Sequence, residues 1–157
     1  STGDSHVDQQ TVYQGDDQLL QRQVNLYHDL IQSGHLGEND FVMSNHVMYP
    51  RQDKASIAGA SKYWMDLLRD ELGFPGRIVS DCLSMKGAHN LLPDDKGLMP
   101  TEAIAALAKR MTEHDGSRLN DLLILTHLEN FYPDQTRPFS RKQHIEVIEH
   151  IIGNMPV

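Results

Sequence analysis

Two acidic residues and a histidine have the placement that acid–base or nucleophilic chemistry requires. Asp4 and His6 flank Ser5 in a polar, glycine-containing segment near the amino terminus. A carboxylate beside an imidazole fixes the tautomer of the ring and makes it more basic, which suits a general acid/base pair. Asp-X-His triplets also arise by chance in a chain with nine histidines. Spacing alone therefore leaves a structural role for His6 open.

The second acidic candidate, Asp81, ends a short apolar run that begins at Arg77 and is expected to form a strand. Functional side chains gather at the carboxyl ends of parallel strands, because the loops there are free of the packing that fills the interior. Asp81 is the best single candidate by position. The alternative is that its carboxylate caps the following turn, through the backbone of Leu83 or through Ser84.

Two further side chains belong to the same neighbourhood. His46 lies near the end of the preceding apolar run and is expected either to face the same pocket or to be a hydrogen-bonded core residue. Cys82 follows Asp81, and only Lys86 nearby supplies a positive charge. We interpret Cys82 as a small buried thiol rather than a nucleophile.

No metal or nucleotide site is predicted. The sequence has no His-Glu-X-X-His motif, and the pairs His28/His35 and His144/His150 do not share a helical face at i, i+4 spacing. It also has no Gly-X-Gly-X-X-Gly and no Walker A sequence.

Composition excludes several classes of protein. The 157 residues carry 14 basic and 22 acidic side chains, a formal charge of −8, which argues against a non-specific nucleic-acid binder. No run approaches the roughly 20 apolar residues of a membrane span. The single cysteine excludes an internal disulfide. The amino-terminal residues lack an apolar signal sequence, so we expect a cytoplasmic location, with a periplasmic or secreted one as the alternative.

The elements that must position these residues alternate in type. Apolar spacing predicts helices over residues 17–33, 61–72, 101–113 and 140–152, with Ser61 and Thr101 as N-caps, and strands over 41–49, 77–81 and 121–126. Residues 1–16 form a loop that carries Asp4 and His6, residues 85–100 form a long loop, and a turn lies at Asp115 and Gly116. This order predicts an α/β unit of parallel strands with right-handed crossovers.

Three strands are few for an autonomous parallel sheet, whose faces and edges must be covered. A complete (β/α)₈ barrel takes about 250 residues, so this length suits a little over half of one. A small doubly wound sheet also fits the length, but only three strands are convincing.

Three motifs in order along residues 3–88 resemble glycoside hydrolase family 3. Residues 72–76 read Leu-Gly-Phe-Pro-Gly and lead to a strand whose end, residues 80–85, reads Ser-Asp-Cys-Leu-Ser-Met. This is similar to the nucleophile segment of bacterial β-N-acetylglucosaminidases, with Cys82 in place of a second Asp. Residues 43–50 resemble the Met-X-Ala-His-X-X-Tyr-Pro strand of that family, and residues 3–6 resemble its mobile Asp-X-His loop.

The resemblance implies a (β/α)₈ barrel of which residues 1–157 form one partial unit: the catalytic loop 1–16 followed by the α-β-α-β-α-β-α order of residues 17–157. It implies retaining hydrolysis of terminal β-linked N-acetylglucosamine, from peptidoglycan fragments or chitin oligosaccharides, without a cofactor. Asp81 would be the nucleophile, His6 the acid/base and Asp4 its orienting partner. His46 and Met85 would bind substrate.

Family members also carry a Lys-His-Phe-Pro-Gly-His-Gly run before the dyad loop, and this chain contains none. We therefore expect the chain to supply the last strands of a barrel, to be inactive or nearly so alone, and to need either another copy or an amino-terminal barrel segment. No nucleic-acid or membrane partner is expected. The runner-up is a doubly wound signalling or ligand-binding domain in which Asp81 accepts a phosphoryl group.

Overall fold

The computed structural model describes residues 3–6, 8, 10–92, 100–114, 116–126 and 140–154. Their helices and strands, in chain order, are β1 (Thr11–Val12), α1 (Asp17–Gln32), β2 (Phe41–Met43), β3 (Val47–Tyr49), β4 (Asp53–Ile57), the 3₁₀ helix η1 (Ala58–Ala60), α2 (Lys62–Asp66), the π-helical η2 (Leu67–Glu71), β5 (Arg77–Cys82), the 3₁₀ helix η3 (Ala88–Leu91), α3 (Pro100–Thr112), β6 (Glu113–His114), β7 (Ser117–Arg118), β8 (Leu122–Ile124) and α4 (Arg141–Asn154).

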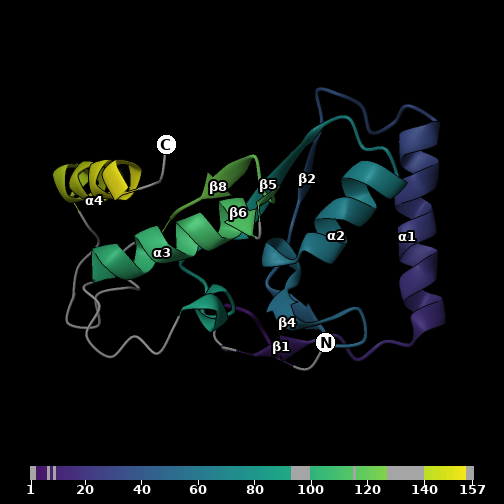
Figure 1. Ribbon diagram of the computed structural model, residues 1–157, viewed down its shortest axis with the longest axis horizontal. Coiled ribbons are helices and arrows are strands. Elements are labelled where there is room, and N and C mark those ends of the chain that lie inside the picture. Colours follow the sequence, from purple (N-terminus) through teal and green to yellow (C-terminus); the bar gives the residue numbers. More distant parts are fainter. Residues whose placement is uncertain are drawn as a thin grey trace.

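The central element is a parallel sheet of three strands in the order β2-β5-β8 (Figure 1). Val42 pairs with Ile78, and Val79 pairs with Leu122, both in parallel register. The predicted parallel α/β arrangement is therefore confirmed. Both helices that link these strands contain residues of the hydrophobic core: Met65 in α2 and several residues in α3.

The single strand predicted over residues 41–49 is wrong, because the chain divides there between two sheets. β2 joins the parallel sheet, whereas β3 pairs with β1 in parallel and with β4 antiparallel. Between β2 and β3, the side-chain oxygen of Asn45 accepts a hydrogen bond from the backbone N–H of Val47 at 2.9 Å. This local bond takes the place of a hydrogen bond to a neighbouring strand. His46 is consequently held in a turn rather than on a strand.

The first helix forms as predicted. Asp16 caps α1 by accepting the Leu19 amide at 2.7 Å, and Gly34, with φ of +74°, ends it. The helix predicted over 61–72 divides into α2 and the wider η2. Ser61 precedes it, but its hydroxyl donates to Asp53 at 2.6 Å and caps no amide.

The later helices also form, with small shifts at their ends. α3 begins at Pro100, so Thr101 lies inside the helix and is not its N-cap. α4 begins after Ser140, whose backbone donates to Gln143 Oε1 at 2.9 Å while its hydroxyl accepts the Gln143 amide at 3.3 Å, a capping box. The predicted loop 85–100 contains η3, and its residues 93–99 lie outside the described residues, as does Asp115.

One face of the parallel sheet packs on the core, and the other is open. Ile78 is 1% exposed and belongs to the same core cluster as Met65 of α2. Phe41 and Met43 point to the opposite side, because side chains alternate along a strand, and they are 50% and 57% exposed. Leu122 on β8 is 43% exposed. This uncovered apolar face is the side that a closed barrel would bury.

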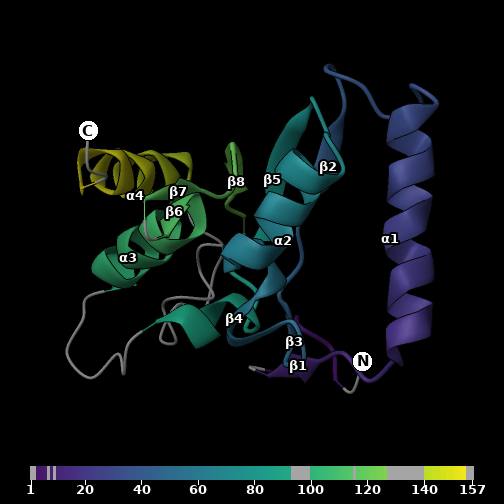
Figure 2. The same cartoon turned by 45° about the vertical axis from the view of Figure 1, so that its right-hand side comes forward.

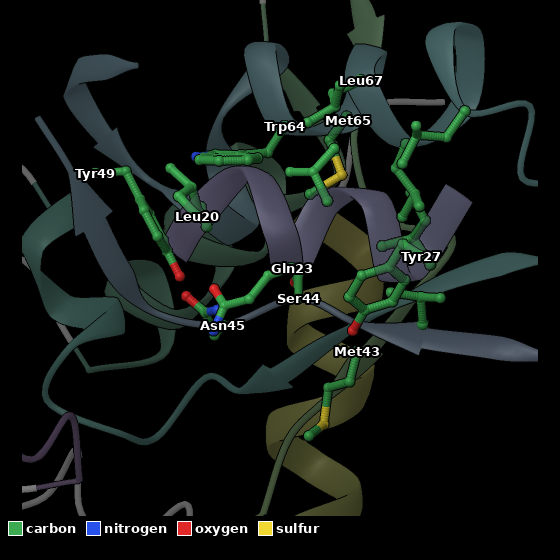
Figure 3. A pocket seen from close by; sticks show the side chains of 16 residues that line it. Leu20, Gln23, Tyr27, Met43, Ser44, Asn45, Tyr49, Trp64, Met65 and Leu67 are labelled. Atoms are coloured by element: carbon green, nitrogen blue, oxygen red, sulfur yellow. The ribbon is translucent and has the colours of Figure 1, made fainter. Parts of the chain in front are cut away.

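Helix α1 stands at one side of the molecule, next to β2 and α2 (Figures 1 and 2). A cavity of about 170 Å³ lies between α1, β2 and α2 (Figure 3). Its wall is mainly apolar, with Gln23, Ser44 and Asn45 among the polar residues that line it. β1 and β4 lie together at the end of the sheet toward which β2 and β5 run (Figures 1 and 2).

Candidate active site

Asp81 lies at the carboxyl end of β5, where the strand departs from regular pairing. The register shifts there, since Val79 pairs with Leu122 and Cys82 pairs with Ile124, so three steps of β5 match two of β8. The Ser80 hydroxyl accepts the Ile124 amide at 3.0 Å in place of a backbone carbonyl. Such bulges re-aim side chains at strand ends.

The backbone around Asp81 is held from the β2 side. The Asp81 amide donates to the Ser44 carbonyl at 3.0 Å, and the Ser44 amide donates to the Val79 carbonyl at 2.8 Å. The carboxylate of Asp81 is half-buried, and its Oδ1 accepts the amide of Cys82 at 2.7 Å. The local bond expected if Asp81 caps a turn is thus present, but it goes to Cys82 rather than to Leu83 or Ser84.

Asp4 and His6 form the predicted pair. Asp4 Oδ1 accepts the backbone amide of His6 at 2.9 Å and lies 2.8 Å from His6 Nδ1. These hydrogen bonds, from the amide first and then from the ring, hold the pKa of Asp4 below its usual value. With Nδ1–H directed at Asp4, the other ring nitrogen, Nε2, is the atom that can exchange a proton with a substrate.

The segment that carries Asp4 and His6 is hydrogen-bonded to the turn that follows β5. The amide of Gly87 donates to the Ser5 carbonyl at 2.9 Å. The charges of Asp81 and His6 both act on the ring of His46, the first raising its pKa and the second lowering it. The bond from Gly87 to Ser5 and the 2.9 Å bond from His46 Nε2 to the Cys82 carbonyl thus bring the segments of His6, His46 and Asp81 together at the end of β5, although these residues are 35 or more positions apart in sequence.

His46 is completely buried, which favours its neutral form. Its Nε2 lies 2.9 Å from the Cys82 carbonyl, which can only accept, so Nε2 carries the proton and Nδ1 keeps a lone pair. Burial lowers the pKa of His46, and this effect outweighs the Cys82 carbonyl and Asp81, which raise it. Nδ1 is buried and has no hydrogen-bond partner within the described residues. An acceptor in that state is suited to a hydroxyl or amide donor of a bound molecule.

Two other residues singled out from the sequence, Met85 and Cys82, lie close to Asp81 along the chain and are more exposed than His46. Met85 lies in the turn after β5 and is 6% exposed. Cys82 is half-buried, with its Sγ 2.9 Å from the Thr126 hydroxyl and 3.1 Å from that of Ser84. Burial raises the pKa of the thiol, but the hydrogen bonds from Ser84 and Thr126 outweigh it and bring the pKa below its usual value.

Two residues that support the site were not identified from the sequence. Asn120 is 2% exposed and donates to the carbonyls of Gly59 and Met111 at 2.7 and 2.6 Å, while it accepts the Ser44 hydroxyl at 2.8 Å. Asp121 accepts the Ile78 amide at 2.7 Å. Only their position at the start of the strand predicted over residues 121–126 was visible in the sequence, because most of their partners are more than 40 residues away.

Among the described side chains, no group of three His, Cys, Asp or Glu residues is placed to hold a metal ion. Within the same residues, no helix has the length and apolar character that crossing a membrane requires.

The chain is similar to known glycosidases over more than half of its length. The profile of the glycosyl hydrolase family 3 N-terminal domain matches residues 1–107. A beta-hexosaminidase of Psychromonas ingrahamii is 38% identical over 86 residues, which are 54% of this chain and 24% of that protein. A beta-hexosaminidase of Vibrio cholerae is 51% identical over 53 residues, 33% of this chain and 16% of that protein. The chain thus matches about a quarter or less of the length of these relatives.

Solved structures share the fold. CbsA from Thermotoga neapolitana superposes with a TM-score of 0.55 at 19% identity, covering 99% of this chain and 29% of that one. The beta-glucoside phosphorylase BglX gives a TM-score of 0.52 at 19% identity, covering 96% and 27%. These similarities confirm an α/β fold of the partial-barrel type and decide against the doubly wound signalling domain. The chain belongs to glycosyl hydrolase family 3.

Proposed function

We propose that this chain carries the nucleophile and the acid/base of a retaining glycosidase that removes terminal β-linked N-acetylglucosamine. The observation that carries the proposal is the attachment of the Asp4–His6 pair to the turn that follows Asp81, through the 2.9 Å bond from Gly87 to Ser5. The naming of the curated relatives as beta-hexosaminidases supports the choice of sugar.

In the first step, a carboxylate oxygen of Asp81 forms a bond to the anomeric carbon while the bond from that carbon to the leaving oxygen breaks. His6 Nε2 transfers its proton to the leaving oxygen. In the second step, neutral His6 takes a proton from water, the water oxygen attacks the anomeric carbon, and Asp81 leaves as a carboxylate. Asp4 holds the ring in the required tautomer through both steps.

A histidine acid suits a site with one nucleophilic carboxylate. An imidazolium near Asp81 attracts the carboxylate, whereas a second carboxylate would repel it. The side chain of His6 is 72% exposed. The loop that carries Asp4 and His6 must therefore close over the substrate to exclude water during proton transfer.

His46 and Met85 are proposed to bind the sugar. The Nδ1 lone pair of His46 would accept a bond from a sugar hydroxyl or the acetamido N–H once binding moves the side chains that cover it. Met85 would add apolar contact. Peptidoglycan fragments and chitin oligosaccharides both present the required terminal sugar.

The open face of the sheet supports the proposal that the active site is completed by further barrel strands. Phe41, Met43 and Leu122 expose apolar side chains there, and an amino-terminal family 3 barrel segment would cover them with strands of the same kind. We propose this segment as the partner. A second copy of this chain is the alternative outcome of the test.

Hydrolysis of a chromogenic β-N-acetylglucosaminide tests the function, with the chain alone and with the amino-terminal barrel segment of a relative. Asp81→Asn should abolish turnover, and His6→Ala should lower it roughly 100-fold or more. The matched controls are Asp29→Asn and His28→Ala, whose side chains on α1 are 78% and 52% exposed. Turnover that survives Asp81→Asn, or no turnover with either sample, would contradict the proposal.

A further inference from the structure

Gly87 occupies a position where the backbone itself does not require glycine. It follows the turn after β5 and precedes η3, with φ of −58° and ψ of −33°, a helical conformation that every L residue adopts readily. The residue is nevertheless buried. The reason for glycine must therefore be the space around it.

That space is filled from two sides. A Cβ built on Gly87 would lie 3.0 Å from the Cβ of Ser5, 3.0 Å from the Cβ of His46 and 3.3 Å from the His46 carbonyl. Contacts this short are rare between real side chains. Because both neighbours are Cβ atoms, fixed to their backbones, neither can swing aside as the end of a long side chain would.

The two segments that meet at Gly87 carry different parts of the site. His46 is joined to the nucleophile strand through its 2.9 Å hydrogen bond to the Cys82 carbonyl. Ser5 separates Asp4 from His6 and accepts the Gly87 amide at 2.9 Å. Asp4 is in turn braced by Asp8, whose Oδ2 accepts the Asp4 amide at 2.7 Å and whose amide donates to the Asp4 carbonyl at 2.7 Å. Gly87 thus contacts the acid/base loop directly and the nucleophile strand through His46.

We infer that Gly87 is a positioning residue that docks the acid/base loop against the nucleophile strand. The contact between Gly87 and the loop of Asp4 and His6 rests on geometry alone. Its effect on catalysis rests on the proposed function. Its missing side chain allows Ser5 to come close enough for the hydrogen bond, which sets how near His6 stands to Asp81. A methyl group at this position would push the loop away and leave Asp81 in place.

The docking is tested first in the unaltered chain by NMR. A through-hydrogen-bond coupling between the Gly87 nitrogen and the Ser5 carbonyl carbon, together with slow exchange of the Gly87 amide, is the expected result. Absence of both would overturn the inference. This measurement needs neither enzymatic activity nor a variant that folds.

Gly87→Ala then tests the role of the missing side chain. Exchange of the residue 87 amide should become at least tenfold faster. Gly37→Ala is the matched control, because a Cβ there meets only Asp40 Oδ2 at 3.8 Å, and it should leave exchange at residue 87 unchanged. Exchange within twofold of the unaltered chain in a folded Gly87→Ala protein would contradict the inference.

The kinetic signature separates positioning from general damage. The assay uses whichever sample turns over substrate, the chain alone or the chain with the amino-terminal barrel segment. In that catalytically competent sample, Gly87→Ala should lower kcat/KM at least tenfold more for an aryl glycoside with a poor leaving group than for a dinitrophenyl glycoside. The dinitrophenolate leaves without being protonated. An equal loss for both substrates would overturn the positioning role. Turnover by neither protein would contradict the proposed function instead, while the exchange result still decides whether Gly87 docks the loop.

Discussion

Asn120→Ala should destabilise the protein by about 2.5–5 kcal/mol, because this one amide joins three segments around β5. Its loss leaves the buried Gly59 carbonyl without the 2.7 Å donor, which costs about 1–3 kcal/mol. The Met111 carbonyl keeps its bond from the Asn120 backbone amide at 3.2 Å. Losing the side-chain bond to this carbonyl therefore costs nearer 1 kcal/mol. The half-buried Ser44 hydroxyl, which can rotate toward water, adds about 0.5–1 kcal/mol.

The assay is urea unfolding followed by the fluorescence of Trp64 and by circular dichroism. Asn25→Ala is the control, since Asn25 is exposed on α1 and its side chain accepts one bond, from Gln21 at 2.9 Å. It should change the free energy of unfolding by no more than about 0.5 kcal/mol. A loss below about 1 kcal/mol for Asn120→Ala would refute the reasoning that this amide holds the ends of β2, η1 and α3 together.

Two further predictions follow from pKa shifts. Because burial lowers the pKa of His46, the unfolded chain binds a proton that the folded chain does not as the pH falls below about 6.5, so stability falls with pH there. In urea unfolding, His46→Gln should reduce the slope of the unfolding free energy against pH by up to about 1.4 kcal/mol per pH unit. The control His28→Gln should leave the slope unchanged. Equal slopes in His46→Gln and the unaltered chain would contradict the prediction. Because hydrogen bonds from Ser84 and Thr126 overcome burial to lower the pKa of the Cys82 thiol, Ser84→Ala should move the midpoint of the pH–rate profile for alkylation upward, and an unmoved midpoint would contradict it.

Regular elements with strong local signals could be predicted from the sequence. The helix ended by Gly34 and the strand from Arg77 are cases in which apolar spacing and turn residues act within a few positions. The single strand over residues 41–49 was wrong because its division depends on Asn45 turning the chain and on the pairing of β3 with β1 and β4. β4 itself, with the sequence Asp-Lys-Ala-Ser-Ile, lacks the apolar alternation that would have revealed it.

In the candidate site as well, residues within local motifs could be predicted, and residues that act through long-range contacts could not. Asp81 and His6 could be selected as candidates because motifs surround each of them, and their catalytic roles stay predictions. Gly87 and Asn120 could not be assigned a role, because each acts on segments that the chain brings together only after folding. Spacing in the sequence carries no record of the 2.9 Å hydrogen bond from the Gly87 amide to the Ser5 carbonyl.

The most direct test of the central claim is the identity of the residue that bonds to the sugar. A fluorinated N-acetylglucosaminide that forms a glycosyl-enzyme quickly and releases it slowly should be mixed with the catalytically competent sample, followed by digestion and peptide mass spectrometry. The account predicts one added sugar on the peptide that contains Asp81, absent in Asp81→Asn and present in Asp29→Asn. Sugar attached to any other residue, or turnover without a trapped intermediate on this chain, would contradict it.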